Sequence, residues 1–277
     1  MIGTDNGILT PALLPRVSPT FDWVAQPWGW MLQCCALRPF VRHGWTTREL
    51  RMTGRDEDCA DLWTLLAATA EAAPDRLVRP SQVHGSEVLC INEAAGAYVR
   101  PLRGDALVSN RDDVLLTIRV ADCVPLLVVD QKTGVIAAVH AGWRGTMRRI
   151  ATQAVAAVHE TFGSRPADLI VAVGPSIGPC CYRVGSDVER AFTEGGWSTR
   201  DRASCFVNHD GDVRLDLWAA NRQMLVHAGV PHAAIHIARL CTVCHPNLFY
   251  SYRRDGPGTG RMIAFIRRGV GKMKNEK

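Results

Sequence analysis

Two histidines and one cysteine, each placed where an extended segment gives way to a turn, are the residues of this sequence best suited to chemistry. His84 precedes a glycine turn, Cys123 follows the β-rich run 114–120, and His140 ends the apolar run 135–139. Imidazole nitrogen and thiolate sulfur form the borderline-soft ligand set that zinc prefers. Three protein ligands, with one coordination position left for water or substrate, are typical of a catalytic zinc site.

A predicted hairpin brings two of these residues together. Residues 124–129 and 135–139 are extended and apolar, and residues 130–134 between them have the composition of a turn. Because a hairpin places its outer ends side by side, Cys123 and His140 should be neighbours. The third ligand then comes from a separate strand end.

The sequence around the trio favours metal ligands over core residues. A lone cysteine is usually a small packing residue, and a lone histidine is usually a hydrogen-bonding group. Here, however, Asp122 precedes Cys123, and His140 opens the sequence HAGWRG, which ends in a glycine after Arg144. Glycines permit close approach of the backbone, and an arginine is suited to hold an anion.

The composition predicts a globular chain whose partners are small molecules. The 277 residues are 47% apolar, and charged residues interrupt each apolar stretch well before membrane-spanning length. No basic segment followed by an apolar core opens the sequence, so we expect a cytoplasmic protein whose ten cysteines are not a disulfide scaffold. The modest charge of +5 favours anionic small molecules over nucleic acid or membranes, and the oligomeric state is left open.

Alternating helices and strands predict a mixed α/β domain in which helices cover the sheets. Residues 1–40 contain five prolines and should be an irregular or edge segment, residues 41–268 a single catalytic domain, and residues 269–277 a basic tail. Apolar periodicity predicts helices at 58–73, 146–162, 217–228 and from 187 onward, and strands at 88–91, 114–120, 169–173, 234–238 and 262–266.

Two other motifs compete with the trio. The segment 241–245, CTVCH, has the spelling of a c-type haem attachment and of half a zinc site. Haem attachment needs export, and a four-cysteine site needs a second pair, for which only Cys180 and Cys181 offer adjacent sulfurs, so packed thiols are favoured. The segment 174–178, GPSIG, matches a serine nucleophile elbow, but the expected helix is missing and a pocket-lining turn is favoured.

Six motifs, taken together, resemble the laccase-domain family, also called the YfiH-type or polyphenol oxidase family and now regarded as purine nucleoside phosphorylases. They are SQVHG at 81–85, GDALV at 104–108, ADCVP at 121–125, HAGWRG at 140–145, GPSIGPCCY at 174–182 and SYRRDG at 251–256. The resemblance covers about residues 40–268. It implies a four-layer αββα sandwich, with zinc bound by His84, Cys123 and His140.

The resemblance also implies phosphorolysis of adenosine, inosine and 5′-methylthioadenosine to base and ribose 1-phosphate, with some deamination of adenosine. Breaking the N-glycosidic bond builds negative charge on the leaving base, and zinc held partly by Cys123 could polarise phosphate, water or substrate. Arg48 and Arg144 could hold phosphate, and Asp122 could act as acid or base; surface ion pairs and a turn-capping carboxylate are the alternatives. After Arg48 the sequence ELRMTG departs from the glycine-rich loop usual in the family.

Three other functions could use the same residues. A copper-dependent polyphenol oxidase is one, because Cu²⁺ binds such ligands more tightly than Zn²⁺ does. The nine scattered histidines contain no H-x-H pair, which disfavours a multicopper cluster. A thiol hydrolase would use Cys123 as nucleophile and His140 or His84 as its base. A binding module with a purely structural zinc is the non-enzymatic alternative.

Overall fold

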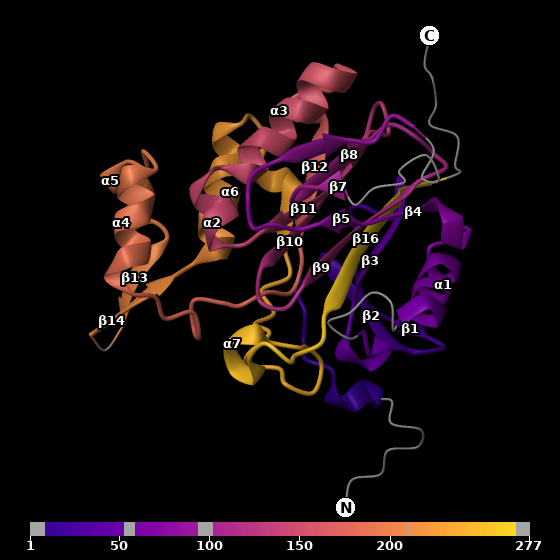
Figure 1. Cartoon of the computed structure of the whole chain (residues 1–277), viewed down its shortest axis with the longest axis horizontal. Coiled ribbons are helices and arrows are strands. Elements are labelled where there is room, and N and C mark those ends of the chain that lie inside the picture. Colours follow the sequence, from indigo (N-terminus) through magenta and orange to yellow (C-terminus); the bar gives the residue numbers. More distant parts are fainter. Residues whose placement is uncertain (1–8, 53–58, 94–101, 210, 270–277) are drawn as a thin grey trace, which may run out of the picture.

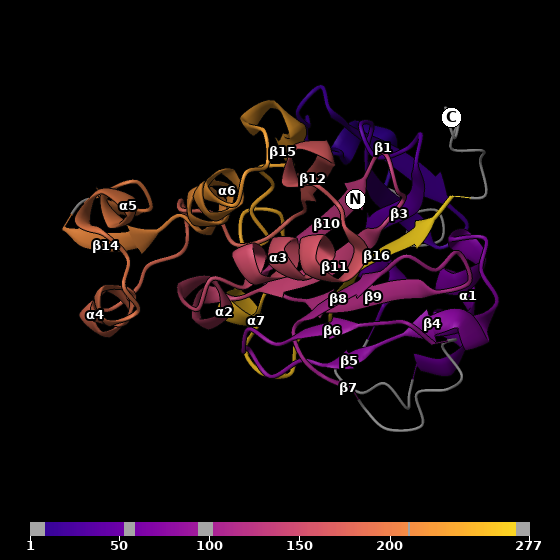
Figure 2. The same ribbon diagram turned by 90° about the horizontal axis from the view of Figure 1, so that it is seen from above.

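The computed structural model describes residues 9–52, 59–93, 102–209 and 211–269. In this part of the chain, two six-stranded sheets pack face to face, with helices on their outer faces (Figures 1 and 2). The layers therefore follow the order helix, sheet, sheet, helix. The predicted αββα sandwich with mixed sheets is confirmed.

The first sheet is closed by a strand from the C-terminal part of the chain. Its order is β1 (Phe21–Gln26), β2 (Gly29–Cys34), β3 (Val41–Thr46), β16 (Met262–Arg268), β9 (Leu115–Val120) and β4 (Leu77–Val78). Only the pairing of β4 with β9 is parallel among the described strands of this sheet. Because β16 lies between β3 and β9, segments far apart in sequence share one hydrogen-bonded layer.

The second sheet contains the predicted hairpin at its centre. Its order is β15 (Ile235–Ile237), β12 (Leu169–Val173), β10 (Val124–Asp130), β11 (Ile136–Ala141), β8 (Ala106–Ser109) and β6 (Val88–Cys90). β10 and β11 pair antiparallel, with Pro125 opposite His140. Two short ribbons join β5 (Pro80–Ser81) to β7 (Leu102–Arg103) and β13 (Phe206–His209) to β14 (Asp212–Leu215).

Helices cover the sheets unequally. α1 (Ala60–Thr69) packs on the first sheet, and α3 (Ile150–Phe162) and α6 (Leu217–His227) pack on the second. The shorter helices are α2 (Trp143–Met147), α4 (Ser186–Glu194), α5 (Thr199–Ala203) and α7 (Tyr252–Asp255). Figure 2 shows α4, α5 and β14 as a small lobe at one side of the sandwich. None of the described helices combines the length and apolar character needed to cross a bilayer.

Strands β10 and β11 are apolar apart from Asp130 and His140 because both faces of each strand are buried. In β10, Leu127 and Val129 join the core between the sheets, whereas Leu126 and Val128 join the core under α3 and α6. Successive side chains of a strand point to opposite faces, so a strand inside two layers needs apolar residues throughout. This explains why continuous apolar runs, rather than alternating ones, marked these strands in the sequence.

One expectation about elements holds only in part and another is wrong. The segment expected to be irregular or at an edge does contain an edge strand, β1, but residues 21–34 are regular and form the hairpin of β1 and β2, since all five prolines of the N-terminal segment fall outside these strands. We propose that this hairpin belongs to the catalytic domain, because β2 pairs with β3. The predicted helix 146–162 is divided into α2 and α3 at Arg149, whose φ of 63° interrupts a right-handed helix. Residues 270–277 of the basic tail lie outside the described residues.

Candidate metal centre

The structure brings His84, Cys123 and His140 together at one end of the β10–β11 hairpin. Their ligand atoms all lie within 4.8 Å of one another. The two imidazole rings meet edge to face, with centroids 4.9 Å apart and an interplanar angle of 83°. His140 lies near the end of β11 and Cys123 directly precedes β10, while His84 comes from the turn between β5 and β6. Burial increases from exposed His84 through half-buried Cys123 to buried His140.

A buried carboxylate, Asp105, orients one of the histidines. The Nδ1 atom of His140 donates a hydrogen bond to Oδ1 of Asp105 over 2.8 Å, and both side chains are almost completely buried. Because Nδ1 is held by this bond, Nε2 is the nitrogen left for a metal. A carboxylate behind a ligating histidine fixes the ring and makes the free nitrogen a better donor.

The same carboxylate fixes the turn that carries the other histidine. Oδ1 of Asp105 accepts a hydrogen bond from the His84 amide at 2.9 Å, and Oδ2 accepts from the Val83 and Gly85 amides at 3.3 and 2.7 Å. These bonds hold His84 in a left-handed conformation with φ of 57°. Sequence reasoning missed this role, although Asp105 directly precedes a buried strand within the GDALV motif.

Asp105→Asn should weaken metal binding without removing a ligand. The amide cannot accept from His140 and the turn amides as the carboxylate does, so we expect the zinc affinity to fall about 10–100-fold. Competition with a chromophoric chelator measures this affinity. Asp112→Asn, the same change at an exposed carboxylate, should leave it unaltered. Equal affinities for Asp105→Asn and the unmodified protein would contradict the assigned role.

The charges of the trio favour a thiolate. Burial raises the pKa of Cys123, but the neighbouring His140 and His84 imidazoles outweigh burial and lower this pKa to about 6. Burial lowers the pKa of His140, but the Cys123 thiolate and the Asp105 carboxylate outweigh it and raise this pKa to about 9. A thiolate is the form that ligates metal, whereas His140 would release its Nε2 proton when an ion binds.

A glycine allows α2 to begin directly against the trio. A Cβ atom at Gly142 would lie 2.9 Å from Sγ of Cys123 and 3.3 Å from Cδ2 of His84. Any side chain here would therefore displace two candidate ligands. The close approach also places the next residues of α2, including Arg144, beside the centre.

The two predicted phosphate-binding arginines lie in different surroundings. Arg144 is exposed, with its guanidinium 4.3 Å from the ring centroid of Trp143. Arg48 instead donates from Nη1 to the carbonyl oxygen of Pro246 over 2.5 Å and lies 4.9 Å from the ring centroid of Tyr250. The contacts of Arg48 thus run to the segment 246–250, whereas Arg144 lies two residues after Gly142, which is close to Cys123.

Both carboxylate oxygens of Asp122 accept hydrogen bonds from other segments of the chain. Its Oδ1 accepts a hydrogen bond from Oγ1 of Thr242 at 2.5 Å, and its Oδ2 accepts from Oγ of Ser251 at 3.0 Å and the Arg253 amide at 2.6 Å. The side chain is buried, and its φ of 93° is unusual for a residue other than glycine. These contacts give no support to an acid or base role and resemble the capping alternative.

Three side chains that the sequence did not single out also approach the centre. Burial raises the pKa of Tyr182, and the negative charge of nearby Cys123 adds to this. The guanidinium of Arg253 lies 4.9 Å from the Tyr182 ring centroid. Arg261 is half-buried. Burial and the positive charge of Arg119 lower the pKa of its guanidinium, and the negative charge of the Cys123 thiolate raises it. Tyr182 and Arg253 belong to two of the six motifs, and this was the available signal.

Known proteins match the chain along most of its length. A family described as multi-copper polyphenol oxidoreductase laccase matches residues 49–269. A purine nucleoside phosphorylase of Bacteroides thetaiotaomicron is 38% identical over 209 residues, which are 73% of this chain and 77% of that protein. Adenosine deaminase RL5, from an unknown prokaryotic organism, is 38% identical over 202 residues, 70% of this chain and 76% of its own length. The crystal structure of Bacillus licheniformis hypothetical protein YfiH superposes with a TM-score of 0.80 at 31% identity, covering 90% of this chain and 99% of that one.

Proposed function

The chain belongs to the multi-copper polyphenol oxidoreductase laccase family, and from this premise we propose that it is a zinc-dependent purine nucleoside phosphorylase. The observation that carries the proposal is the convergence of His84, Cys123 and His140, braced by Asp105. The proposed substrates are adenosine, inosine and 5′-methylthioadenosine with phosphate. The relative named purine nucleoside phosphorylase supports this activity, and the relative named adenosine deaminase supports a second activity on adenosine.

The donor set fits a zinc ion with one position for substrate. His84, Cys123 and His140 would hold the ion, which would supply a Lewis acid beside the substrate. In the ranges that the structure describes, no other histidine, cysteine or acidic side chain joins this group. A catalytic zinc site has three protein ligands and leaves the fourth tetrahedral position to water or substrate.

Arg144 is the side chain proposed to hold phosphate. A guanidinium matches the geometry of phosphate oxygens, and that of Arg144 is exposed beside the trio. Stacking on Trp143 restricts its position without using its hydrogen-bond donors. Arg261 adds a second positive charge near Cys123. For Arg48 we propose a supporting role, since its guanidinium is engaged by Pro246 and Tyr250.

The family name also points to copper-dependent phenol oxidation, which the ligand arrangement supports less well. A multicopper cluster needs many histidines close together. The candidate ligands of the described chain form one His/Cys/His group and one group of four cysteines. The first of these groups contains only two imidazoles, which suits a single ion.

A thiol hydrolase is the second alternative, because the lowered pKa of Cys123 and the raised pKa of His140 favour a thiolate–imidazolium pair. Metal dependence separates the two possibilities. A thiol enzyme would work without metal and would be inactivated when iodoacetamide alkylates Cys123. A phosphorylase that relies on zinc would lose turnover on chelation instead.

A chromatographic assay tests the proposal directly. Purified protein is incubated with adenosine or inosine, with and without phosphate, and the bases are separated. We expect adenine and hypoxanthine only when phosphate is present, loss of both with a chelator, and recovery when zinc is added. Base release by metal-free protein, or phenol oxidation with copper and no base release, would refute the phosphorylase. Inosine formed from adenosine without phosphate would reveal the deaminase activity.

A further inference from the structure

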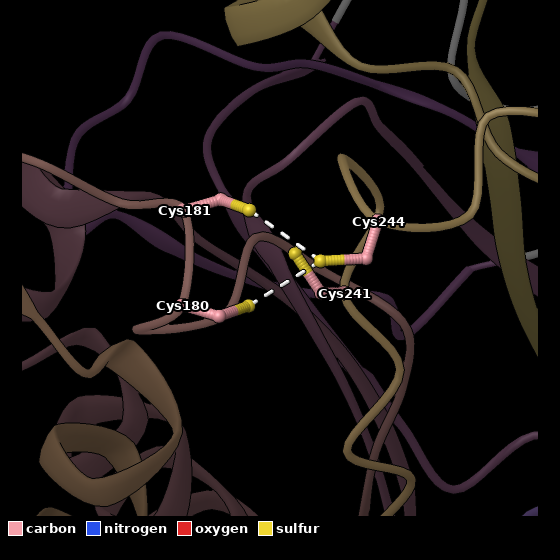
Figure 3. Close-up of side chains that lie close together, drawn as sticks. All are labelled: Cys180, Cys181, Cys241 and Cys244. Carbon is pink, nitrogen blue, oxygen red and sulfur yellow. Dashed lines mark hydrogen bonds between the residues drawn. The ribbon is translucent and has the colours of Figure 1, made fainter.

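Four cysteines from two separate segments converge at a second place in the molecule. Figure 3 shows Cys180 and Cys181 facing Cys241 and Cys244. All four sulfur atoms lie within 4.8 Å of one another. Sγ of Cys244 is 3.5 Å from Sγ of Cys180 and 3.4 Å from Sγ of Cys181. We propose that these four thiolates bind one structural zinc ion.

The distances between the sulfurs suit a metal better than a disulfide. With zinc–sulfur bonds of about 2.3 Å, the sulfurs of a tetrahedral site are separated by about 3.8 Å. The observed separations, from 3.4 Å to at most 4.8 Å, span this value. A disulfide would require about 2.05 Å, and none of the four cysteines forms one. Small side-chain movements would therefore complete a tetrahedral site.

The backbone holds the two segments side by side without help from a metal. Ser176 and Cys241 form a parallel bridge. The Ser176 amide donates to the Leu240 carbonyl oxygen over 3.1 Å, and the Thr242 amide donates to the Ser176 carbonyl oxygen over 3.1 Å. The Trp218 indole anchors the bridge by donating to Oγ of Ser176 over 2.6 Å. Because these contacts preposition the cysteines, little ordering remains for metal binding to impose.

Hydrogen-bond donors and positive charges surround the sulfurs. The Gly178 amide donates to Sγ of Cys241 over 3.3 Å. Arg254 donates from Nη1 to the carbonyl oxygens of Thr242 and Val243 over 3.0 and 3.3 Å, and Arg214 donates to the carbonyl oxygen of Cys180. Four thiolates around a divalent ion carry a net charge of −2, which nearby guanidinium groups and amides offset.

Packed thiols, which the sequence favoured, do not explain this arrangement. Cys180 and Cys244 are exposed, so apolar packing accounts for buried Cys241 and half-buried Cys181 but not for the other two. Exposed neighbouring thiols are open to oxidation, whereas thiolates in a closed tetrathiolate site are protected. The haem alternative has no support either, since Cys241 and Cys244 share their surroundings with two further cysteines.

A zinc ion bound by these four cysteines would hold together two loops that lie beside the His84, Cys123 and His140 group. The Ile177 amide, three residues before the first cysteine pair, donates to the carbonyl oxygen of Asp122 over 2.9 Å. Thr242, between the second pair, donates to Asp122, the residue before Cys123. The ion would thus stabilise the region beside the proposed active site without contacting substrate.

Zinc counting tests the proposal independently of catalysis. Protein purified under reducing conditions is loaded with zinc, freed of excess metal and analysed by atomic emission. We expect two ions per chain for the unmodified protein, one for Cys244→Ser and one for Cys123→Ser. Cys90→Ser, at a half-buried cysteine outside both groups, should keep two. A Cys123→Ser chain without zinc, or a Cys244→Ser chain with two ions, would overturn the proposal.

Cobalt provides a test that does not depend on the folding of Cys244→Ser. In the Cys123→Ser chain, a tetrathiolate site loaded with Co²⁺ should show strong sulfur-to-cobalt charge-transfer absorption. Absence of this absorption would overturn the proposal, as would a disulfide among the four cysteines under reducing conditions. The Cys123→Ser chain should hold one zinc ion whether or not the phosphorylase assay succeeds, so the two proposals fail separately.

Discussion

Cys123→Ala should reduce phosphorolysis about a thousandfold or more, equivalent to a barrier increase of about 4 kcal/mol, and should remove one zinc ion per chain. Cys123 supplies the only sulfur and the only anionic donor of the His84, Cys123 and His140 group. Two neutral imidazoles bind zinc far more weakly than a set that includes a thiolate. Turnover of inosine with phosphate and the zinc content of the same preparation measure both effects.

The matched control for this change is Cys90→Ser, which should retain activity and metal. Circular dichroism of Cys123→Ala should be unaltered, since the β10–β11 pairing beside residue 123 does not depend on its side chain. Full turnover in a Cys123→Ala protein that has lost the ion would exclude both the zinc-dependent mechanism and a thiol nucleophile.

Asp122→Ala should lower the free energy of unfolding by about 3–5 kcal/mol. The change removes one acceptor from three buried or half-buried donors: the Thr242 and Ser251 hydroxyls and the Arg253 amide. Leaving such donors unpaired costs more than the hydrogen bonds themselves contribute. Asp122→Asn keeps one acceptor oxygen and should cost less. Urea denaturation followed by tryptophan fluorescence measures the difference.

The same variant decides whether Asp122 acts in the chemistry. Asp122→Ala could instead fold with the stability of the unmodified protein and have no turnover. Asp122 would then act as an acid or base, and its hydrogen bonds would not stabilise the fold. Asp112→Ala, at an exposed carboxylate, is the control and should change neither quantity.

The strands that could be predicted are those whose residue types show directly that the strand is buried. β10, β11 and β12 are apolar apart from Asp130 and His140 because they lie inside two layers, and their apolar runs predict them. The β1–β2 hairpin is more polar because β1 is at the edge of its sheet, and nearby prolines suggested irregular structure. The break at Arg149 depends on the left-handed backbone of this single residue, which the apolar periodicity of residues 146–162 does not predict.

The same distinction holds for the candidate site. His84, Cys123 and His140 are recognisable because their chemical types coincide with strand ends. Asp105 and Asp122 differ, since their roles depend on partners 20 to 35 and 120 to 131 residues away in the sequence. The cysteines of one pair are likewise 60 to 64 residues from those of the other, and hydrogen bonds around the Ser176–Cys241 bridge bring the pairs together.

The position of β16 has a consequence for biosynthesis. Until Met262–Arg268 emerges from the ribosome, β3 and β9 each lack the neighbour that separates them in the finished sheet. Open strand edges of this kind invite pairing with other nascent chains. The first sheet can therefore be completed only after residues 262–268 have been synthesised, and a chain that ends before residue 262 would be aggregation-prone rather than a smaller folded protein.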